Sequence, residues 1–356
     1  MLYYTIMKKY TLYIYFAVSV LLLCLTAGCN STPVRQSERA LLPVNQVQKG
    51  IVLQRAAALR RVLAPMELRG AGITLNAYRN RLLPAPQMMK LVKELGFNRI
   101  FCHITSETEL SEDLKELLSA AADAGLPVEL TLRQGDFRQR FRGNALVRTL
   151  LPQFRTLPDL ARDIVEFNSA LPEKCRLAGV TVRFEPHLFS SANEADKIPG
   201  MLYIWNNDTF GPGLDNDKLV KLCINQLQLM KADLKGLPLS VELPDFYPRW
   251  VKEGKLTSGR ARDFKAVGKV MIQCSGNLPS ELVTLSREAF AGEKKMSAVI
   301  PLAGHTSIRS GALRRRNWSD LTAAVGFFVN STRKQNCSGV VLRPLSELGY
   351  MLLEQD

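Results

Sequence analysis

The chain has 356 residues and a formal net charge of +14, and 46% of its residues are hydrophobic, which is normal for a folded core. Such a positive balance favours anionic partners: lipid headgroups, acidic glycans or nucleic acid. Seven cysteines are scattered along the sequence without CxxC spacing, which argues against a disulfide framework and against a structural zinc site.

The first 28 residues have the three parts of an export signal. Two lysines open the segment, an apolar run follows over Thr11–Leu25, and small residues then precede Cys29. The apolar run is shorter than the roughly 20 residues that span a bilayer core. The end of the segment, Thr26-Ala27-Gly28-Cys29, resembles the lipobox of bacterial lipoproteins, although the family usually has leucine where Thr26 stands. This resemblance implies cleavage before Cys29 and attachment to a membrane through lipid on its thiol.

An ordinary secretory signal or a short anchor helix remains an alternative for this segment. Asn30 follows the candidate lipidated cysteine, whereas enteric-type sorting uses Asp there to retain a lipoprotein at the inner membrane. The resemblance therefore implies transport to an outer membrane in a host that has one. Because an exported protein rarely meets nucleic acid, we expect no nucleic-acid partner.

Beyond the signal, residues 29–48 are polar and are predicted to form a flexible tether, and residues 49–356 are predicted to form one domain. A short helix is predicted over Gly50–Val62, after which strands and helices alternate. The eight predicted strands cover Gly72–Asn76, Arg99–Ile104, Val128–Leu132, Ala178–Phe184, Leu239–Leu243, Val270–Cys274, Ala298–Leu302 and Gly339–Leu342. The helices predicted after them cover Pro86–Leu95, Glu112–Ala124, Leu157–Ala170, Lys218–Leu234, Ala261–Ala266, Pro279–Phe290, Trp318–Arg333 and Pro344–Leu353.

This alternation predicts the α/β class and parallel strands joined by crossover helices. Eight strand–helix units fit a closed (β/α)₈ TIM barrel, and the competing architecture is an open doubly wound sheet. The first turn, Asn76–Asn80, contains no glycine-rich phosphate loop, which favours the barrel, and we expect no cofactor. The five cysteines beyond Cys29 are predicted to be buried thiols.

In a barrel the functional residues lie at the carboxyl ends of the strands. The segment Leu177–Pro186 resembles the fourth-strand signature DxxDxDxE of chitinase-like hydrolases, which implies a glycosidase-like barrel with Glu185 in the place of the general acid. The three supporting carboxylates of that signature are replaced here by Ala178, Thr181 and Arg183. Arg183 lies on the same strand face and should hold Glu185 ionised, which suits a base, a nucleophile or a salt bridge better than an acid.

Glycoside hydrolysis needs a second carboxylate about 5 Å away for retention or about 6.5–9.5 Å away for inversion. Glu242, at the end of the fifth strand, is the candidate, and Asp245 comes next. The seventh strand has no carboxylate, although many barrel glycosidases have one there. The alternative is that Glu185 and Glu242 form structural ion pairs, for example with Arg183 or Arg343.

Arginines and aromatic residues gather in the loops that would surround this end of the barrel. Arginine suits carboxylate and sulfate groups, because its guanidinium donates two parallel hydrogen bonds, and aromatic rings provide apolar faces for sugars. The alternatives are solvated arginines facing anionic lipid, and aromatic rings that only pack the loops. The predicted substrate-binding residues are Arg133, Arg183, Trp205, Asp245, Tyr247, Trp250 and His305.

All three histidines, His103, His187 and His305, fall at or beyond predicted strand ends without HxH or HxxE spacing, so no metal site is predicted. The sequence favours a lipid-anchored barrel of the cell envelope that binds or hydrolyses carbohydrate, with an anionic glycan as candidate ligand. The alternatives are a non-catalytic barrel that serves as an envelope binding or scaffold lipoprotein, and a metal hydrolase.

Overall fold

The structure is a computed structural model that describes residues 42–79, 84–104, 109–133, 150–184, 215–260, 263–274, 295–303, 313–314, 318–333, 337–345 and 348. The predicted signal segment, Cys29 and the predicted helix Pro279–Phe290 lie outside these residues, as does most of the predicted helix Pro344–Leu353.

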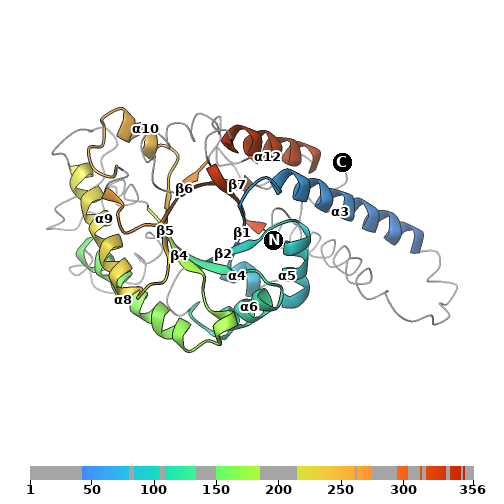
Figure 1. Ribbon diagram of the computed structural model, residues 1–356, viewed down its shortest axis with the longest axis horizontal. Helices are drawn as coiled ribbons and strands as arrows, with labels where there is room; N and C mark the ends of the chain where they lie inside the picture. Colours follow the sequence, from blue (N-terminus) through green and yellow to red (C-terminus); the bar gives the residue numbers. More distant parts are fainter. Residues whose placement is uncertain are drawn as a thin grey trace, which may run out of the picture.

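Eight parallel strands form a closed barrel (Figure 1). The order around the ring is β6-β5-β4-β3-β2-β1-β9-β7, and pairing of β6 with β7 closes it. A two-residue strand, β8 (Leu313–Arg314), pairs with the end of β7. The barrel strands are β1 (Leu68–Thr74), β2 (Arg99–Ile104), β3 (Val128–Arg133), β4 (Gly179–Arg183), β5 (Leu239–Leu243), β6 (Lys269–Gln273), β7 (Lys295–Ala303) and β9 (Cys337–Arg343). The predicted TIM barrel is confirmed.

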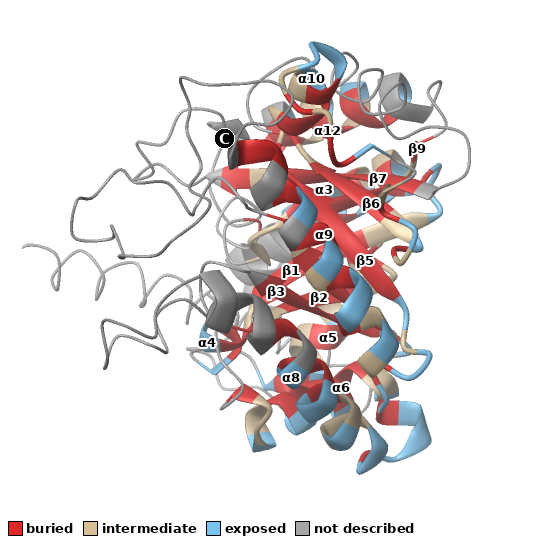
Figure 2. Ribbon diagram, turned by 90° about the vertical axis from the view of Figure 1, so that its left-hand side faces the viewer, coloured by how far each residue is buried: buried red, intermediate tan, exposed pale blue. Residues whose placement is uncertain are grey.

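Helices surround the barrel and join successive strands (Figure 1). Their apolar faces and the outer faces of the strands form the main core, and Figure 2 shows the strands as the most continuously buried part of the molecule. The helices are α3 (Leu42–Leu63), α4 (Leu75–Arg79), α5 (Ala85–Glu94), α6 (Glu112–Asp123), α8 (Leu150–Ser169), α9 (Asp215–Asp233), α10 (Tyr247–Lys252) and α12 (Trp318–Arg333), with a 3₁₀ turn, η4 (Glu173–Cys175), before β4.

Helix α3 begins at Leu42, which lies inside the segment predicted to be a tether. It packs beside α12: the Trp318 indole N–H donates to the Arg55 carbonyl at 3.1 Å, and Val62 lies against Gly326 about two turns further along both helices. The two helices therefore run in the same direction, from the carboxyl ends of the strands to the amino ends. Within the described part of the chain, no helix is both long and apolar enough to cross a membrane.

Two other predicted elements differ from the structure. The first strand is Leu68–Thr74, whereas Gly72–Asn76 was predicted. Two glycines, Gly70 and Gly72, lie within the observed strand. No α-helix forms in the described part of Ala261–Ala266, and the short helix after β5 is instead α10, with a proline in its first turn.

An apolar layer crosses the middle of the barrel interior. It consists of Phe101, Met271, Val299 and Val341, from four different strands, and it is separate from the main core. Gly70 makes room for it, because a Cβ at that position would come within 2.5 Å of the Phe101 ring and 2.8 Å of Val341. This layer separates the two ends of the barrel, each of which holds a buried glutamate.

Candidate functional site at the carboxyl end of the barrel

Glu242 on β5 is the buried carboxylate at the carboxyl end, and its side chain is 2% exposed. Arg343, the last residue of β9, donates to both of its oxygens: Nη1 lies 2.6 Å from Oε2, and Nη2 binds Oε1. Arg183, the last residue of β4, places its Nε 3.4 Å from Oε1. Because β5 and β9 are not neighbours in the ring, the Glu242–Arg343 pair spans the barrel interior.

The strand register brings these three side chains together. Arg183 is the direct cross-strand partner of Glu242, so both face the interior at the same level. Across the barrel, a Cβ at Gly72 would lie 2.5 Å from the Arg343 Cβ, so only glycine leaves space for this arginine. The glycine, the two arginines and the glutamate form one unit, which we call the mouth cluster.

A second cluster, which we call the floor cluster, lies at the amino end. Glu129 on β3 binds Arg99 at the start of β2 and Lys269 at the start of β6, the latter at 2.9 Å, while the Thr181 hydroxyl donates to its second oxygen at 3.0 Å. Burial would raise the pKa of the Glu129 carboxyl, but Lys269 and Arg99 outweigh it and hold that pKa below its ordinary value.

The sequence analysis missed the floor cluster, because only the carboxyl ends of the strands were searched for functional side chains. A signal was present: Glu129 interrupts the apolar run Val128–Leu132, and Lys269 directly precedes the strand predicted from Val270. A charge inside such a run requires a buried partner of opposite sign.

Three of the predicted substrate-binding residues lie on or next to α10. Asp245 and Trp250 are half-buried, and the Trp250 ring lies 4.4 Å from the Phe246 ring, centroid to centroid. Tyr247 is fully buried and packs edge-on against Phe184, with centroids 5.6 Å apart. Its ring is therefore part of the core, whereas the sequence analysis placed Tyr247 among the substrate-binding residues.

Several predicted site residues lie outside the described part of the chain: Glu185, Trp205 and His305, together with the side chain of Arg133. The distance between the Glu185 and Glu242 carboxylates is therefore undetermined, and their catalytic pairing stays a prediction. Among the histidines, His103 is described, and its Nδ1 lies 3.0 Å from the Thr131 carbonyl oxygen. Within the described residues, no group of three His, Cys, Asp or Glu side chains is placed to hold a metal ion.

The five cysteines beyond Cys29 are confirmed as buried free thiols. Burial raises the pKa of Cys102 to about 12, with a smaller contribution from Glu109, so its thiol stays protonated at neutral pH.

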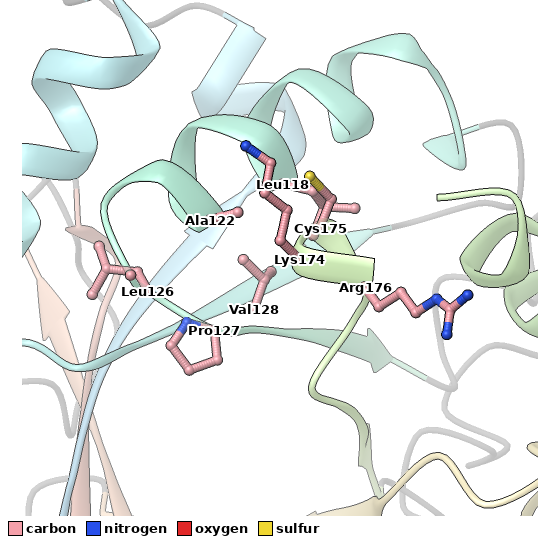
Figure 3. A pocket seen from close by; sticks show the side chains of 9 residues that line it. Leu118, Ala122, Leu126, Pro127, Val128, Lys174, Cys175 and Arg176 are labelled. Atoms are coloured by element: carbon pink, nitrogen blue, oxygen red, sulfur yellow. The ribbon is translucent and has the colours of Figure 1, made fainter. Parts of the chain in front are cut away.

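A small pocket of about 240 Å³ lies at the other end of the barrel, between α6 and η4 (Figure 3). Leu118, Leu126 and Val128 give it an apolar wall, and Arg176 points away from the other lining side chains in this view. Lys174 at its edge pairs with Asp123 at 2.9 Å. The pocket is remote from the mouth cluster and smaller than the roughly 300–1,000 Å³ usual for ligand sites.

No protein-family model matches the sequence, and no curated protein matches it. Solved structures with a similar fold include a β-1,4-D-mannanase from Cryptopygus antarcticus, at 12% identity over 82% of this chain and 91% of that one, with a TM-score of 0.47. A family 1 β-glucosidase from Thermotoga maritima follows, at 8% identity over 79% and 88%, with a TM-score of 0.48.

An N-acetylneuraminate lyase from Proteus mirabilis is also similar, at 10% identity over 81% of this chain and 72% of that one, with a TM-score of 0.39. Similarity at this level does not indicate a reaction, because one barrel fold supports many chemistries. The barrel architecture of this chain rests on its own strand pairing.

Proposed function

We propose that this protein is a lipid-anchored carbohydrate-binding barrel of the cell envelope, and that its mouth cluster binds an acidic group of an anionic glycan. The observation that carries the proposal is the grouping of two arginines around one buried carboxylate at the end of the barrel where TIM barrels bind their ligands.

The mouth cluster, as defined by Gly72, Arg183, Glu242 and Arg343, contains two positive charges and one negative charge. Arg183 and Arg343 together carry two charges, and Glu242 offsets one of them. The arginine side chains are 17% and 20% exposed, whereas Glu242 is almost fully covered. An incoming carboxylate or sulfate therefore meets guanidinium groups first, and these donate paired hydrogen bonds to such anions.

Glu242 holds the two arginines in place in this proposal. Both of its oxygens are bound by Arg343, so neither is placed to exchange a proton with a sugar. Hydrolysis would need Glu185 together with a second exposed carboxylate. The geometry of Glu242 thus favours binding over hydrolysis.

The aromatic pair Phe246 and Trp250 supports a sugar ligand. The half-buried Trp250 ring lies on α10, the helix after the strand of Glu242, and it packs against the Phe246 ring. Such a ring offers an apolar face to the C–H groups of a pyranose. Lipid anchorage is supported by the ordered charged start, apolar run and Ala-Gly-Cys of the first 29 residues.

The binding proposal is tested by calorimetric titration with an oligogalacturonate and with a neutral oligosaccharide of the same length. We expect only the acidic ligand to bind. Arg343→Met should lower the affinity for it about tenfold or more, as expected when a charged hydrogen-bond pair is lost. Arg99→Met, the matched arginine of the floor cluster, should leave affinity unchanged. Equal binding of both ligands, or equal losses in both variants, would refute the proposal.

Two further measurements test the other parts of the proposal. Release of reducing ends from the same ligand would show hydrolysis, and its abolition by Glu242→Gln would assign Glu242 to the reaction and contradict the holding role. Incorporation of labelled palmitate that is lost with Cys29→Ser is expected for a lipoprotein. Retention of the label in that variant would contradict anchorage at this cysteine.

A further inference from the structure

Most of the exposed large hydrophobic side chains that the structure describes lie on two adjacent helices. Among the described residues four large hydrophobic side chains are exposed, and three of them lie on the adjacent helices α3 and α12: Ile51 at 42%, Leu53 at 49% and Phe327 at 57%. The fourth, Leu229, lies on α9 in another part of the helix ring (Figure 1). Ile51 and Leu53 lie on either side of the buried Val52, so these side chains border the outward face of the two helices and do not form one contiguous patch.

Charge is polarised in the same direction. Helix α3 contains four basic residues and no acidic one, and Arg60 and Arg61 are exposed near its end. Helix α6, by contrast, contains four acidic residues and one lysine. Three of these acids are paired with Arg79, Lys115 and Lys174, so a negatively charged surface would be attracted by the α3 side more than by the α6 side.

The chain itself leads from this surface to the predicted lipid anchor. Twelve residues separate Cys29 from Leu42, the first residue of α3, and a fully extended chain of this length reaches about 45 Å. Because Arg55 pairs with the first residue of α12, the preceding part of α3 extends about 20 Å beyond that helix. A lipid on Cys29 would hold the start of α3 close to the bilayer.

We propose that the α3–α12 surface, defined by Ile51, Leu53, Arg60, Arg61 and Phe327, rests on the anionic bilayer that carries the anchor. The apolar side chains enter the region between headgroups and acyl chains, and the arginines pair with lipid phosphates, as in interfacial helices. This inference rests on the anchorage that forms part of the proposed function. It adds an orientation, in which one side of the barrel faces the membrane.

The test uses the chain from residue 29 onward with Cys29→Ser, which retains all described elements and cannot be lipidated. Co-sedimentation with phosphatidylglycerol-containing vesicles should show binding, and with pure phosphatidylcholine vesicles much less. Ile51→Ser/Leu53→Ser/Phe327→Ser should lower the partition coefficient at least tenfold, because it removes three apolar contacts. The matched control is Leu229→Ser, which alters the remaining exposed hydrophobic residue and should change nothing.

A second pair of variants separates location from net charge. Arg61→Glu and Lys221→Glu change the total charge equally at exposed positions on α3 and α9. Arg61→Glu should weaken vesicle binding by more than fivefold, since each basic residue near an anionic surface contributes about that factor. Equal effects of the two variants, or wild-type binding by the triple-serine variant, would overturn the proposal. Self-association that the triple variant abolishes would replace it with an interface between two copies.

The Arg343→Met variant distinguishes vesicle binding by the α3–α12 surface from binding at the glycan site. Vesicle binding should survive that substitution, whereas loss of vesicle binding would place the lipid headgroup at the mouth cluster and overturn the α3–α12 assignment. Absence of palmitate on the native chain would refute the lipid anchorage but not the membrane-binding surface, because the vesicle assay uses serine at position 29.

Discussion

The two ends of the barrel interior hold clusters of the same charge but different bonding. Each has one glutamate and two cationic partners, and Glu129 and Glu242 are equally well covered. The cations are similarly exposed at both ends, Arg99 and Lys269 at 29% and 18% and the two mouth arginines at 17% and 20%. In the floor cluster the carboxylate also accepts a hydrogen bond from the Thr181 hydroxyl, and Lys269 lies 5.4 Å from the Phe101 ring centroid. In the mouth cluster Arg343 uses two of its five N–H donors on Glu242, within the described residues.

We propose that the two ends of the interior have separate roles. The floor cluster joins β2, β3, β4 and β6 and acts as a brace, in keeping with the stabilising role of the amino end of such barrels. The mouth cluster presents guanidinium groups at the end where ligands bind. The apolar layer of Phe101, Met271, Val299 and Val341 lies between them, so substitutions at one end should leave the other intact.

The largest expected effect is loss of either glutamate. Glu129→Gln and Glu242→Gln should each lower the free energy of unfolding by about 3 kcal/mol, because each leaves two cations without their buried carboxylate. Only Glu242→Gln should alter glycan binding, lowering affinity for an acidic ligand several-fold, because the two arginines lose the carboxylate that holds them in place. Urea denaturation and calorimetry measure both quantities. A change in affinity with Glu129→Gln would show that the two clusters are not independent.

An intermediate effect is expected from two glycines of β1. Gly70→Ala forces a methyl group against the Phe101 ring and Val341, and Gly72→Ala forces one against Arg343. Each should cost about 1–3 kcal/mol of stability through overpacking. Gly70→Ala should leave affinity for the acidic ligand unchanged, while Gly72→Ala displaces Arg343 and should lower it. If both variants bind as wild type, the position of Arg343 does not control binding.

The smallest effect is a pH dependence of the floor cluster. Because the pKa of Glu129 is lower in the folded protein than its ordinary value of about 4.3, its contribution to stability is complete above that value. The contribution is lost as the pH falls through the folded-state pKa. The difference in free energy of unfolding between wild type and Glu129→Gln should therefore become smaller when urea denaturation is repeated at acidic pH. Asp159→Asn, at an exposed ion pair, should leave the free energy of unfolding nearly unchanged.

The barrel could be predicted from sequence because its strands are short apolar runs between glycine-terminated helices. Arg99–Ile104 and Leu239–Leu243 are strands with the predicted bounds, and α12 is the helix Trp318–Arg333 as predicted. The first strand was shifted because glycine is rare in strands, and only the crowded interior at Phe101 and Arg343 explains Gly70 and Gly72. Such crowding depends on distant residues.

The candidate site was predictable only in part. The search of strand ends found Arg183, Glu242 and Arg343, but which of them pair depends on the closed ring, which brings β9 across the interior from β5. Tyr247 was misplaced because sequence position after a strand does not say which way a ring turns on a short helix. Here the helix turns the ring inward, against Phe184.

The pairing of β1 with β9 and of α3 with α12 has a consequence for biosynthesis. The first and last strands lie side by side, with Leu68 opposite Gly339, so the ring cannot close until almost the whole chain has been made. Until then β1 keeps an open edge, and α3 lacks the helix against which it packs. The emerging polypeptide therefore has to remain incompletely folded, and in need of protection from aggregation, until its final strand is synthesised.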